Sequence, residues 1–417
     1  MSERTMPGPS RAGRTSPELK KPERIRSGQT SVHVWFAGAI GIVALLTGCG
    51  GGFFPPLAPA SGGGGGTPGN TTGDFVYVAN GTTNTIAGFA VATSTAGAGT
   101  LTAVAGSPYA FSFPPLTMAV TPTNSYLYVA GIGGIYAYAI NGSTGVLTAA
   151  NQGGAVAISQ LGTVSIDISP DGQWLFGLAA DGGTLNEYQI NNTNGTLGVQ
   201  PSVQYVVANG ATVLPKMVRV AATGAYVALA LGTGGDVVFP FNTKTGAFGT
   251  TYQQIPTGNP QASDNGLAID SASTFLYLAR SGAGSGVVVY GFGANGALSP
   301  VAGSPFAAGG GPFSMLLDST GKYAYAANRT DGTITGYTIG TGGVLTALSG
   351  SPFKSGTSIT SLARDKSGSY VLAAASGGTP DLAMYSFDKT TPGNLSSVAT
   401  AATGADPTGP VAVVATH

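Results

Sequence analysis

Short apolar segments alternate with polar turns from residue 74 to the end of the chain. Each segment spans about six residues rich in Val, Tyr, Leu and Ala, and the turns contain Gly, Asn, Asp, Ser or Thr. This composition favours β-strands, and no long stretch shows the apolar spacing of an amphipathic helix. The pattern therefore predicts an all-β fold.

One apolar segment recurs seven times at nearly even spacing. Corresponding residues in successive copies are 51, 48, 52, 49, 48 and 47 positions apart. A period near 49 residues with several strands per unit is typical of a β-propeller, so seven copies predict seven blades. The copies are FVYVAN (75–80), YLYVAG (126–131), WLFGLA (174–179), YVALAL (226–231), FLYLAR (275–280), YAYAAN (323–328) and YVLAAA (370–375).

A second apolar segment precedes every copy except the first, across a tight turn such as SPDG (169–172). Asp and Gly suit such turns, because Asp can bond to nearby backbone and Gly tolerates unusual dihedral angles. With the two strands that follow each copy, we expect four strands per blade. The preceding segments are PLTMAVTP (115–122), TVSIDISP (163–170), KMVRVAA (216–222), GLAIDSA (266–272), FSMLLDS (313–319) and ITSLARDK (359–366).

The two ends of the repeat region complement each other. The first copy lacks a preceding strand, and GPVAVVATH (409–417) is a strand with no successor. We expect this last strand to become the innermost strand of the blade whose other strands lie at 75 to about 107, because that pairing closes the ring and removes an open sheet edge.

A short phrase recurs as AVAGSPY (103–109), PVAGSPF (300–306) and ALSGSPF (347–353). It follows the outermost strand of a blade, where we expect it to turn the chain back toward the centre. Gly permits unusual dihedrals, Pro withholds a donor at an edge, and the aromatic residue can cap a crevice between blades. The phrase therefore predicts architecture rather than chemistry.

The charge of the chain is low and unevenly distributed. Of 417 residues, 17 are Lys or Arg, 17 are Asp or Glu and 68 are Gly. Residues 1–31 carry a net charge of +4 and the remainder −4. The repeat region thus lacks the clustered basic residues that nucleic-acid binding requires, so we expect no nucleic-acid partner.

An export segment precedes the repeats. The basic stretch is followed by VWFAGAIGIVALLTGCG (34–50), whose apolar run is too short for a comfortable membrane span. LLTGC (45–49) resembles the bacterial lipobox, which implies that Cys49 carries lipid. Alternatively, Cys49 is an ordinary thiol and the segment stays as an uncleaved anchor. We expect a signal segment at 1–48, the lipidated cysteine with a Gly/Pro-rich tether at 49–73, and the propeller at 74–417.

The motifs resemble a known family. YVANGTTNTIAGF (77–89), TGVLTA (144–149), VAGSPF and SPDGQWLF (169–176) look like the lactonase-type seven-bladed propellers, which include 6-phosphogluconolactonase-like proteins and muconate-cyclising relatives. YVANGTTNTI also resembles the YVTN-type repeats of cell-envelope propellers. The resemblance implies a His, Arg and acidic cluster at the mouth of the central channel.

This sequence departs from that cluster. Apart from His33 in the export segment, the only histidine is the terminal His417, which we expect to fray. Asp167 and Arg219 occupy equivalent positions on successive inner strands, with Arg364 one position further along. They could activate water and polarise a lactone carbonyl. Alternatively, Asp167 and Arg219 satisfy each other where two blades meet.

The remaining candidates for ligand binding are Glu187, the only glutamate after residue 23, and two arginines that end their strands. Arg280 and Arg329 are interpreted as solvated rim charges. Zinc lacks its Cys and His ligands, and TDG (330–332) or ADG (180–182) is a single turn rather than a calcium loop. We predict neither a metal site nor a cofactor.

Two functions remain. The scarcity of titratable residues favours a monomeric binding or scaffolding module, held to the cell envelope only by its lipid anchor, whose partner is an envelope protein or a carbohydrate or lactone. The family resemblance instead implies a lactonase-like hydrolase acting on a sugar lactone such as 6-phosphogluconolactone or gluconolactone.

Overall fold

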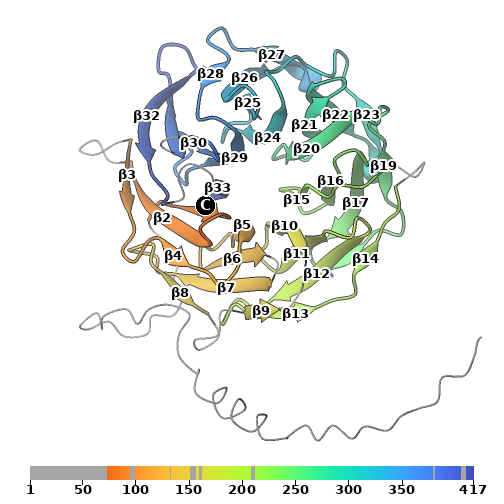
Figure 1. The fold of residues 1–417 in the computed structure, drawn as a ribbon. Coiled ribbons are helices and arrows are strands. Elements are labelled where there is room, and N and C mark those ends of the chain that lie inside the picture. Colours follow the sequence, from red (N-terminus) through yellow and green to blue (C-terminus); the bar gives the residue numbers. More distant parts are fainter. Residues whose placement is uncertain are drawn as a thin grey trace, which may run out of the picture. The chain divides into compact units, whose positions relative to one another are not determined.

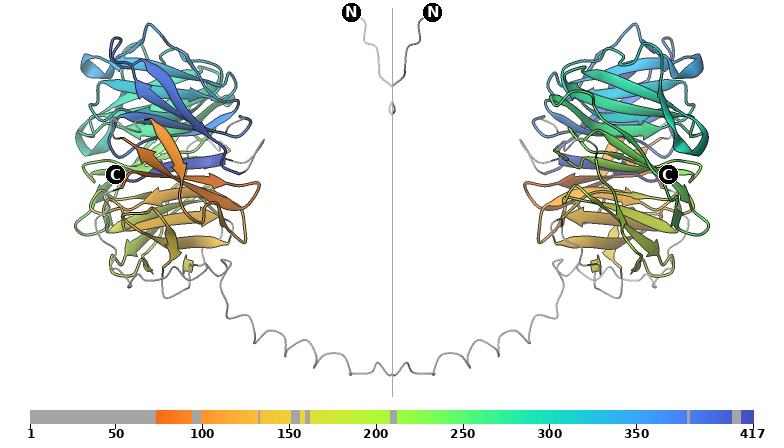
Figure 2. Two further views of the ribbon diagram at one scale, coloured as in Figure 1. Left: turned by 90° about the vertical axis from the view of Figure 1, so that its left-hand side faces the viewer. Right: turned by 90° about the vertical axis from the view of Figure 1, so that its right-hand side faces the viewer.

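The computed structural model describes residues 73–93, 99–131, 133–150, 156–158, 162–207, 212–378, 381–404 and 410–417. These residues form seven antiparallel sheets arranged as a ring (Figure 1), and Figure 2 shows the ring from two sides. The predicted seven-bladed all-β propeller is confirmed. The export segment, Cys49 and the tether lie outside the described residues.

Each blade contains four main strands, as predicted, and we number the blades from the N-terminal end. From the centre outward they are β33 (Pro410–Ala415), β1 (Phe75–Asn80), β2 (Thr85–Ala92) and β3 (Thr100–Ala103) in blade 1; β5 (Pro115–Val120), β6 (Tyr126–Gly131), β7 (Gly134–Ile140) and β8 (Leu147–Ala149) in blade 2; and β10 (Thr163–Ile168), β11 (Trp174–Ala179), β12 (Thr184–Ile190) and β13 (Leu197–Val199) in blade 3. They continue with β15 (Met217–Val220), β16 (Tyr226–Ala230), β17 (Asp236–Asn242) and β18 (Ala247–Phe248) in blade 4; and β20 (Ala262–Ile269), β21 (Phe275–Gly282), β22 (Gly286–Phe292) and β23 (Leu298–Pro300) in blade 5. The last are β24 (Pro312–Leu317), β25 (Tyr323–Asn328), β26 (Thr333–Ile339) and β27 (Leu345–Ala347) in blade 6; and β29 (Ile359–Arg364), β30 (Tyr370–Ala375), β31 (Leu382–Phe387) and β32 (Leu395–Ala401) in blade 7.

Short additional strands pair with the third strand in five blades, which the sequence pattern did not predict. They are β4 (Tyr109–Ala110), β9 (Val156–Ile158), β14 (Val203–Gln204), β19 (Gln253–Ile255) and β28 (Phe353–Lys354). Short 3-10 helices, η3 (Ala294–Gly296) and η4 (Thr341–Gly343), precede two outer strands.

The recurring GSP phrase explains how two of these extra strands arise. Its serine hydroxyl accepts a hydrogen bond from a backbone N–H in the third strand of the blade, at a point beyond the end of the short outer strand. The Ser107 hydroxyl accepts from the Gly88 N–H at 2.8 Å, and the Ser351 hydroxyl accepts from the Gly336 N–H at 2.9 Å. The chain then rejoins the third strand at the following aromatic residue. Ser304 makes the same bond in blade 5, from the Val289 N–H at 2.9 Å.

The ring closes through both ends of the chain, as predicted. β33 pairs antiparallel with β1, with Tyr77 opposite Val414 and Val78 opposite Val413. In Figure 1 the closing strand lies beside the first strands of the chain. Blade 1 therefore takes its innermost strand from the C-terminus and the rest from the N-terminal part of the repeat region.

The closure reproduces a bond made inside five of the other six blades. In blade 7, the Tyr370 N–H at the start of the second strand donates to the Asp365 carboxylate just after the inner strand, at 2.6 Å. Asp318, Asp270, Ser169 and Thr121 accept the corresponding bond in four other blades. In blade 1 the Phe75 N–H donates to the Thr416 hydroxyl at 3.0 Å, and the Thr416 N–H donates to the Phe75 carbonyl. Thr416 thus fills the repeat position although the chain is interrupted there.

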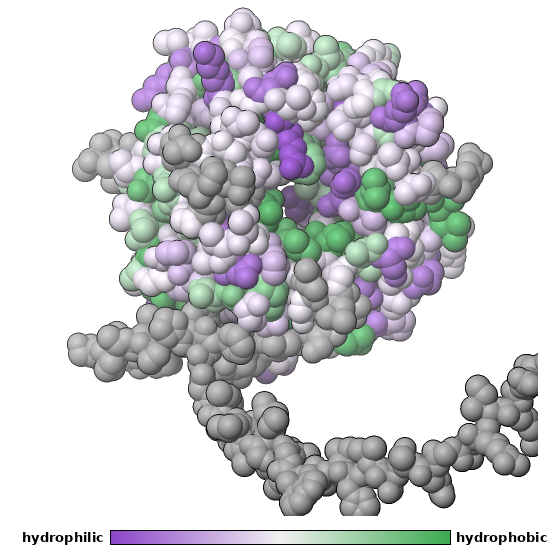
Figure 3. Space-filling view, viewed as in Figure 1, coloured by the Kyte–Doolittle hydropathy of each residue, from purple (hydrophilic) through white to green (hydrophobic). Residues whose placement is uncertain are grey.

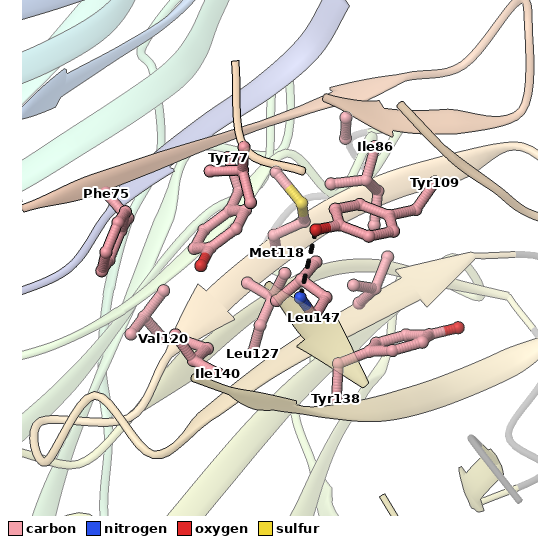
Figure 4. Close-up of a cluster of buried hydrophobic side chains, with 13 residues drawn as sticks. Phe75, Tyr77, Ile86, Tyr109, Met118, Val120, Leu127, Tyr138, Ile140 and Leu147 are labelled. Carbon is pink, nitrogen blue, oxygen red and sulfur yellow. Dashed lines mark hydrogen bonds between the residues drawn. The ribbon is translucent and has the colours of Figure 1, made fainter. Parts of the chain in front are cut away.

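Apolar clusters lie between each pair of neighbouring blades and form the core. Figure 4 shows the cluster between blades 1 and 2, where the Tyr109 hydroxyl accepts a hydrogen bond from the Leu147 N–H at 3.2 Å. The predicted capping of an inter-blade crevice by this aromatic residue is confirmed. The Tyr77 hydroxyl also reaches the next blade and donates to the Gly145 carbonyl at 2.7 Å. Tyr128 and Tyr325 repeat that bond in other blades.

Within the described residues, no helix is long and apolar enough to cross a membrane.

Candidate functional site

A small cavity lies along the axis of the ring. Its volume is about 180 Å³, and its lining comes from the inner strands of all seven blades and residues next to them. Figure 3 shows the opening of this channel in the middle of one face. Ligand pockets for drug-sized molecules usually have ~300–1,000 Å³, so this cavity suits a small ligand.

Hydroxyl groups in the cavity wall mainly bridge neighbouring blades. The Ser165 hydroxyl on β10 accepts a hydrogen bond from the Val218 N–H on β15 at 3.1 Å. Thr117 on β5 accepts one from the Ile166 N–H on β10 at 3.4 Å. Because inner strands of different blades belong to different sheets, these side chains supply bonds across the gap. Ser165 and Thr117 are therefore occupied by bonds between blades.

The charged residues of the wall are Lys216 and Arg219, and none of the described lining residues is acidic. Lys216 precedes β15, and its ammonium group forms no hydrogen bond or ion pair with the residues that the structure describes. The aliphatic part of its side chain runs past Gly232, where an added Cβ would lie 3.3 Å from Cε. The sequence pattern did not single out Lys216, although it is the only lysine in the inner-strand segments before residue 366.

Asp167 and Arg219 pair with each other, as one of the two sequence-based interpretations expects. An Arg219 guanidinium nitrogen lies 3.4 Å from an Asp167 carboxylate oxygen, and the side chains are 39% and 19% exposed. Asp167 and Arg219 occupy equivalent positions, each next to the last residue of its inner strand. In the second strand of the blade, Asp167 is paired with Phe176 and Arg219 with Ala228. The Asp167 carboxylate also accepts a hydrogen bond from the Val220 N–H at 2.8 Å. The Asp167 side chain therefore accepts a backbone N–H of the next blade, as the Ser165 and Thr117 hydroxyls do, and connects blades 3 and 4.

Arg364 lies one position nearer the turn on β29, as the sequence predicts, and it is exposed. Its guanidinium donates a 3.3 Å hydrogen bond to the Leu317 carbonyl on β24, so it too connects neighbouring inner strands.

The expectation that His417 frays is wrong. Its backbone N–H donates to the Asn124 side chain at 2.7 Å, and its backbone carbonyl accepts from the same amide at 2.9 Å. Nε2 of the ring lies 3.2 Å from the Val120 carbonyl. The residue as a whole stays exposed, yet loss of hydration around the ring is the main cause that lowers the pKa of His417. The charges of Arg364 and Arg219 lower this pKa further, while the Val120 bond and the Asp167 charge oppose the shift.

The interpretation of Arg280 as a solvated rim charge is also wrong. Arg280 is only 8% exposed and forms a two-pronged ion pair with the fully buried Asp264, at 2.6 and 2.7 Å. Asp236 on β17 is fully buried beside them. Burial, together with the charge and hydrogen bond of Asp264, raises the pKa of Asp236 well above its usual value. Burial therefore favours the neutral form of Asp236 beside the Asp264–Arg280 ion pair.

Arg329 is exposed, as the rim interpretation predicts, and its guanidinium lies 4.7 Å from the centre of the Phe313 ring. Glu187 is only 4% exposed, lies in β12, and does not line the described cavity. Burial raises the pKa of Glu187 to about 7, and its cross-strand partner Phe176 belongs to the apolar cluster between blades 3 and 4. Glu187 is thus enclosed between blades rather than presented to a ligand.

The described residues include no group of three or more His, Cys, Asp or Glu side chains placed to hold a metal ion.

The lactonase family model, described as a seven-bladed β-propeller, matches residues 274–412, from the start of β21 into β33. A 6-phosphogluconolactonase candidate from Bacteroides fragilis aligns with a TM-score of 0.64 at 18% identity, covering 83% of this chain and 98% of that chain. The periplasmic gluconolactonase of Pseudomonas aeruginosa aligns with a TM-score of 0.62 at 18% identity, covering 83% and 99%. No curated protein sequence matches.

The fold and the channel define a seven-bladed β-propeller with a small cavity on its axis. Its resemblance to the lactonase-type propellers, indicated first by the repeat motifs, is confirmed at the level of the fold.

Proposed function

We propose that the protein is a ligand-binding propeller that takes up a small anionic molecule in its central channel and does not hydrolyse it. The observation that carries this proposal is Lys216 in the cavity wall, because its ammonium group has no ion pair with the described residues, whereas the second cation of the wall, Arg219, is paired with Asp167. Cations in a partly enclosed site attract anions strongly, because fewer water molecules screen them there.

A sugar acid fits this site in size and charge. The similar structures are named for sugar lactones, and the product of opening such a lactone is a hydroxylated carboxylic acid. Its carboxylate would pair with the free ammonium group of Lys216, and its hydroxyls would meet the hydroxyl of Ser361 in the wall. The absence of turnover is proposed because the carboxylate nearest the site, Asp167, is held by Arg219 and by a backbone N–H.

Isothermal titration of the full-length protein with 6-phosphogluconate, gluconate and glucose tests the proposal. We expect binding of the two acids and none of neutral glucose. Lys216→Gln should weaken gluconate binding about 10- to 100-fold, because a hydrogen bond to a charged group contributes ~1.5–3 kcal/mol. Lys244→Gln is the matched control, since Lys244 is exposed in the turn between β17 and β18. Equal affinity for glucose and gluconate would contradict the proposal.

Lactone hydrolysis is a second candidate, favoured by the position of His417. A neutral imidazole beside Asp167 and Arg219 could take a proton from the attacking water while Arg219 stabilises the developing oxyanion. The ring ester C–O bond would then break to give the hydroxy acid. Base uptake at constant pH with 6-phosphogluconolactone and gluconolactone distinguishes the two functions. Turnover above the spontaneous rate that disappears in Asp167→Asn would establish the hydrolase and refute the binding-only proposal.

We further propose that the propeller works at the cell envelope, held there by lipid on Cys49. The support is the apolar run that ends in LLTGC and the uncharged Gly/Pro-rich segment after it.

A further inference from the structure

One position of the inner strands bridges most neighbouring blades through its side chain. The Ser314 hydroxyl on β24 accepts the Leu362 N–H of β29 at 3.2 Å, and the Met217 sulfur on β15 accepts the Leu267 N–H of β20 at 3.3 Å. The bonds already described from β5 and β10 are made at the same position. Among the described residues, four of the seven junctions between blades therefore have this bridge.

The bridges fix the direction of the backbone that they bond. An N–H that donates to the preceding blade points away from the second strand of its own blade, because alternate residues of an antiparallel pair face opposite edges of the strand. The strand registers place Met118 and Val413 at the positions of Ile166 and Val218, whose N–H groups are bridged. The N–H groups of Met118 and Val413 therefore face the channel as well.

The bridging bond is missing at both of these N–H groups. Ala412 occupies the position that would bridge to Met118, and its side chain has no acceptor. Ser361 occupies the position that would bridge to Val413, but its hydroxyl makes no hydrogen bond with the residues that the structure describes. All four residues line the cavity. Two unbridged N–H groups and one free hydroxyl thus lie at one level on blades 7, 1 and 2, and we call this set the donor arc.

Lys216 lies across the channel from the donor arc. In Figure 1, β15 and β33 lie on opposite sides of the centre of the ring. Lys216 directly precedes Met217, which is the residue of blade 4 equivalent to Ser361, so the lysine is close to the level of the arc. The terminal carboxylate of His417 lies beside Asn124, in the turn after β5, and thus beyond the other end of the inner strands.

We propose that the channel takes a sugar diacid, with one carboxylate paired with Lys216 and the other bound by the donor arc. This inference rests on the proposed binding of anions in the channel. Backbone N–H groups only donate, so the ligand atoms at the arc must be acceptors, and a carboxylate is an acceptor at both oxygens. Hydrogen bonds to an ionised acceptor are about twice as strong as those between neutral groups, so a second carboxylate uses the arc better than a hydroxyl does.

Glucarate and gluconate are the matched probes, because they differ only in whether the second end of the chain is a carboxylate or a hydroxymethyl group. Isothermal titration of the full-length protein should give about 10- to 100-fold tighter binding of glucarate. Ser361→Ala should weaken glucarate binding about 10-fold and gluconate binding about 2-fold, since only glucarate places a charge on this hydroxyl. Ser143→Ala is the control variant, because Ser143 is exposed in the turn between β7 and β8.

The backbone donors can be observed directly by nuclear magnetic resonance of the wild-type protein. The chain has only six methionines, so selective ¹⁵N-methionine labelling gives few signals, and Met118→Leu and Met315→Leu assign two of them. Glucarate should move the Met118 amide proton downfield, as a hydrogen bond to a carboxylate does. Met315 is the internal control: its N–H is also unbridged, because Gly266 occupies the bridging position, but Met315 does not line the described cavity. Its signal should stay in place.

These outcomes separate the inference from the function on which it rests. Equal affinity for glucarate and gluconate would overturn the sugar diacid while leaving the binding of single acids intact. A Met118 signal that does not move at saturation with glucarate, or a Ser361→Ala variant that weakens both acids equally, would overturn the donor arc in the same way. If neither acid binds, the proposed function fails and the inference fails with it.

Discussion

The ring contains two Asp–Arg pairs that differ in burial, and their contributions to stability should differ accordingly. Asp264 is fully buried and Arg280 nearly so, with two bonds of 2.6 and 2.7 Å between them. Arg280→Met keeps most of the side-chain volume but leaves the Asp264 carboxylate without its cation. Breaking a buried pair by removing one partner costs ~3–5 kcal/mol, because an uncompensated charge stays in a medium of low dielectric constant.

The Asp167–Arg219 pair is the matched control. Its single contact is 3.4 Å long and its side chains are 39% and 19% exposed. Exposed pairs contribute ~0–1 kcal/mol, so Arg219→Met should lower the free energy of unfolding by no more than about 1 kcal/mol. The two variants thus compare the same substitution at two levels of burial.

Calorimetry and urea unfolding give the magnitude. The unfolding entropy of a ring of about 340 residues is ~0.7 kcal/mol/K, so Arg280→Met should lower Tm by about 4–7 °C and Arg219→Met by less than about 2 °C. Variants that unfold within about 1 kcal/mol of each other would refute this reasoning.

Three further outcomes follow from the closure and the export segment. Removing residues 410–417 takes β33 from blade 1, so the truncated chain should lose cooperative unfolding or self-associate by size-exclusion chromatography; a melting curve like that of the full chain would disprove closure by this strand. Burial, with the hydrogen bond and charge of Asp365, raises the pKa of Asp74 to about 7 from 3.8, so this group stabilises the fold fully below about pH 4 and loses that contribution as pH rises through about 7. Asp74→Asn should flatten this part of the stability profile, measured by urea unfolding at each pH, and an unchanged slope would assign it to other groups. Cys49→Ala should abolish detergent-dependent membrane fractionation of the expressed protein, whereas persistent membrane association would favour an uncleaved anchor.

The architecture was predictable because the same pattern of strands and turns recurs along the sequence. Seven copies of one apolar segment indicate the blades, and the unmatched strand at 409–417 indicates the closure. The equivalence of Asp167 and Arg219 follows from their common distance to the turn, and the strand registers confirm it.

The environment of Arg280 was not predictable from its place at the end of an apolar segment. β21 continues to Gly282, and a register shift between Asp264 and Gly266 sets Asp264 directly opposite Arg280. Such a bulge breaks the alternation of faces that a sequence pattern assumes. The available signal was the pair itself, an acid and a base in two neighbouring strands that carry no other charged residue.

The ordered position of His417 was not predicted because chain termini generally fray. That expectation fails here because the Asn124 amide holds both backbone polar groups of the last residue. Lys216 begins a predicted inner-strand segment but was assigned no role, and in the structure it directly precedes β15.

The closure of blade 1 also sets the order in which the protein can be completed. The Phe75 N–H is bonded to the Thr416 hydroxyl, 341 positions later in the sequence. The first blade to be synthesised therefore cannot be completed until the last strand has been synthesised. Until then β1 presents an unpaired edge that other chains and proteases can recognise. A chain that is cut short never hides that edge. Protection of the β1 edge therefore depends on the last strand of the ring, which is formed only after the other six blades have been synthesised.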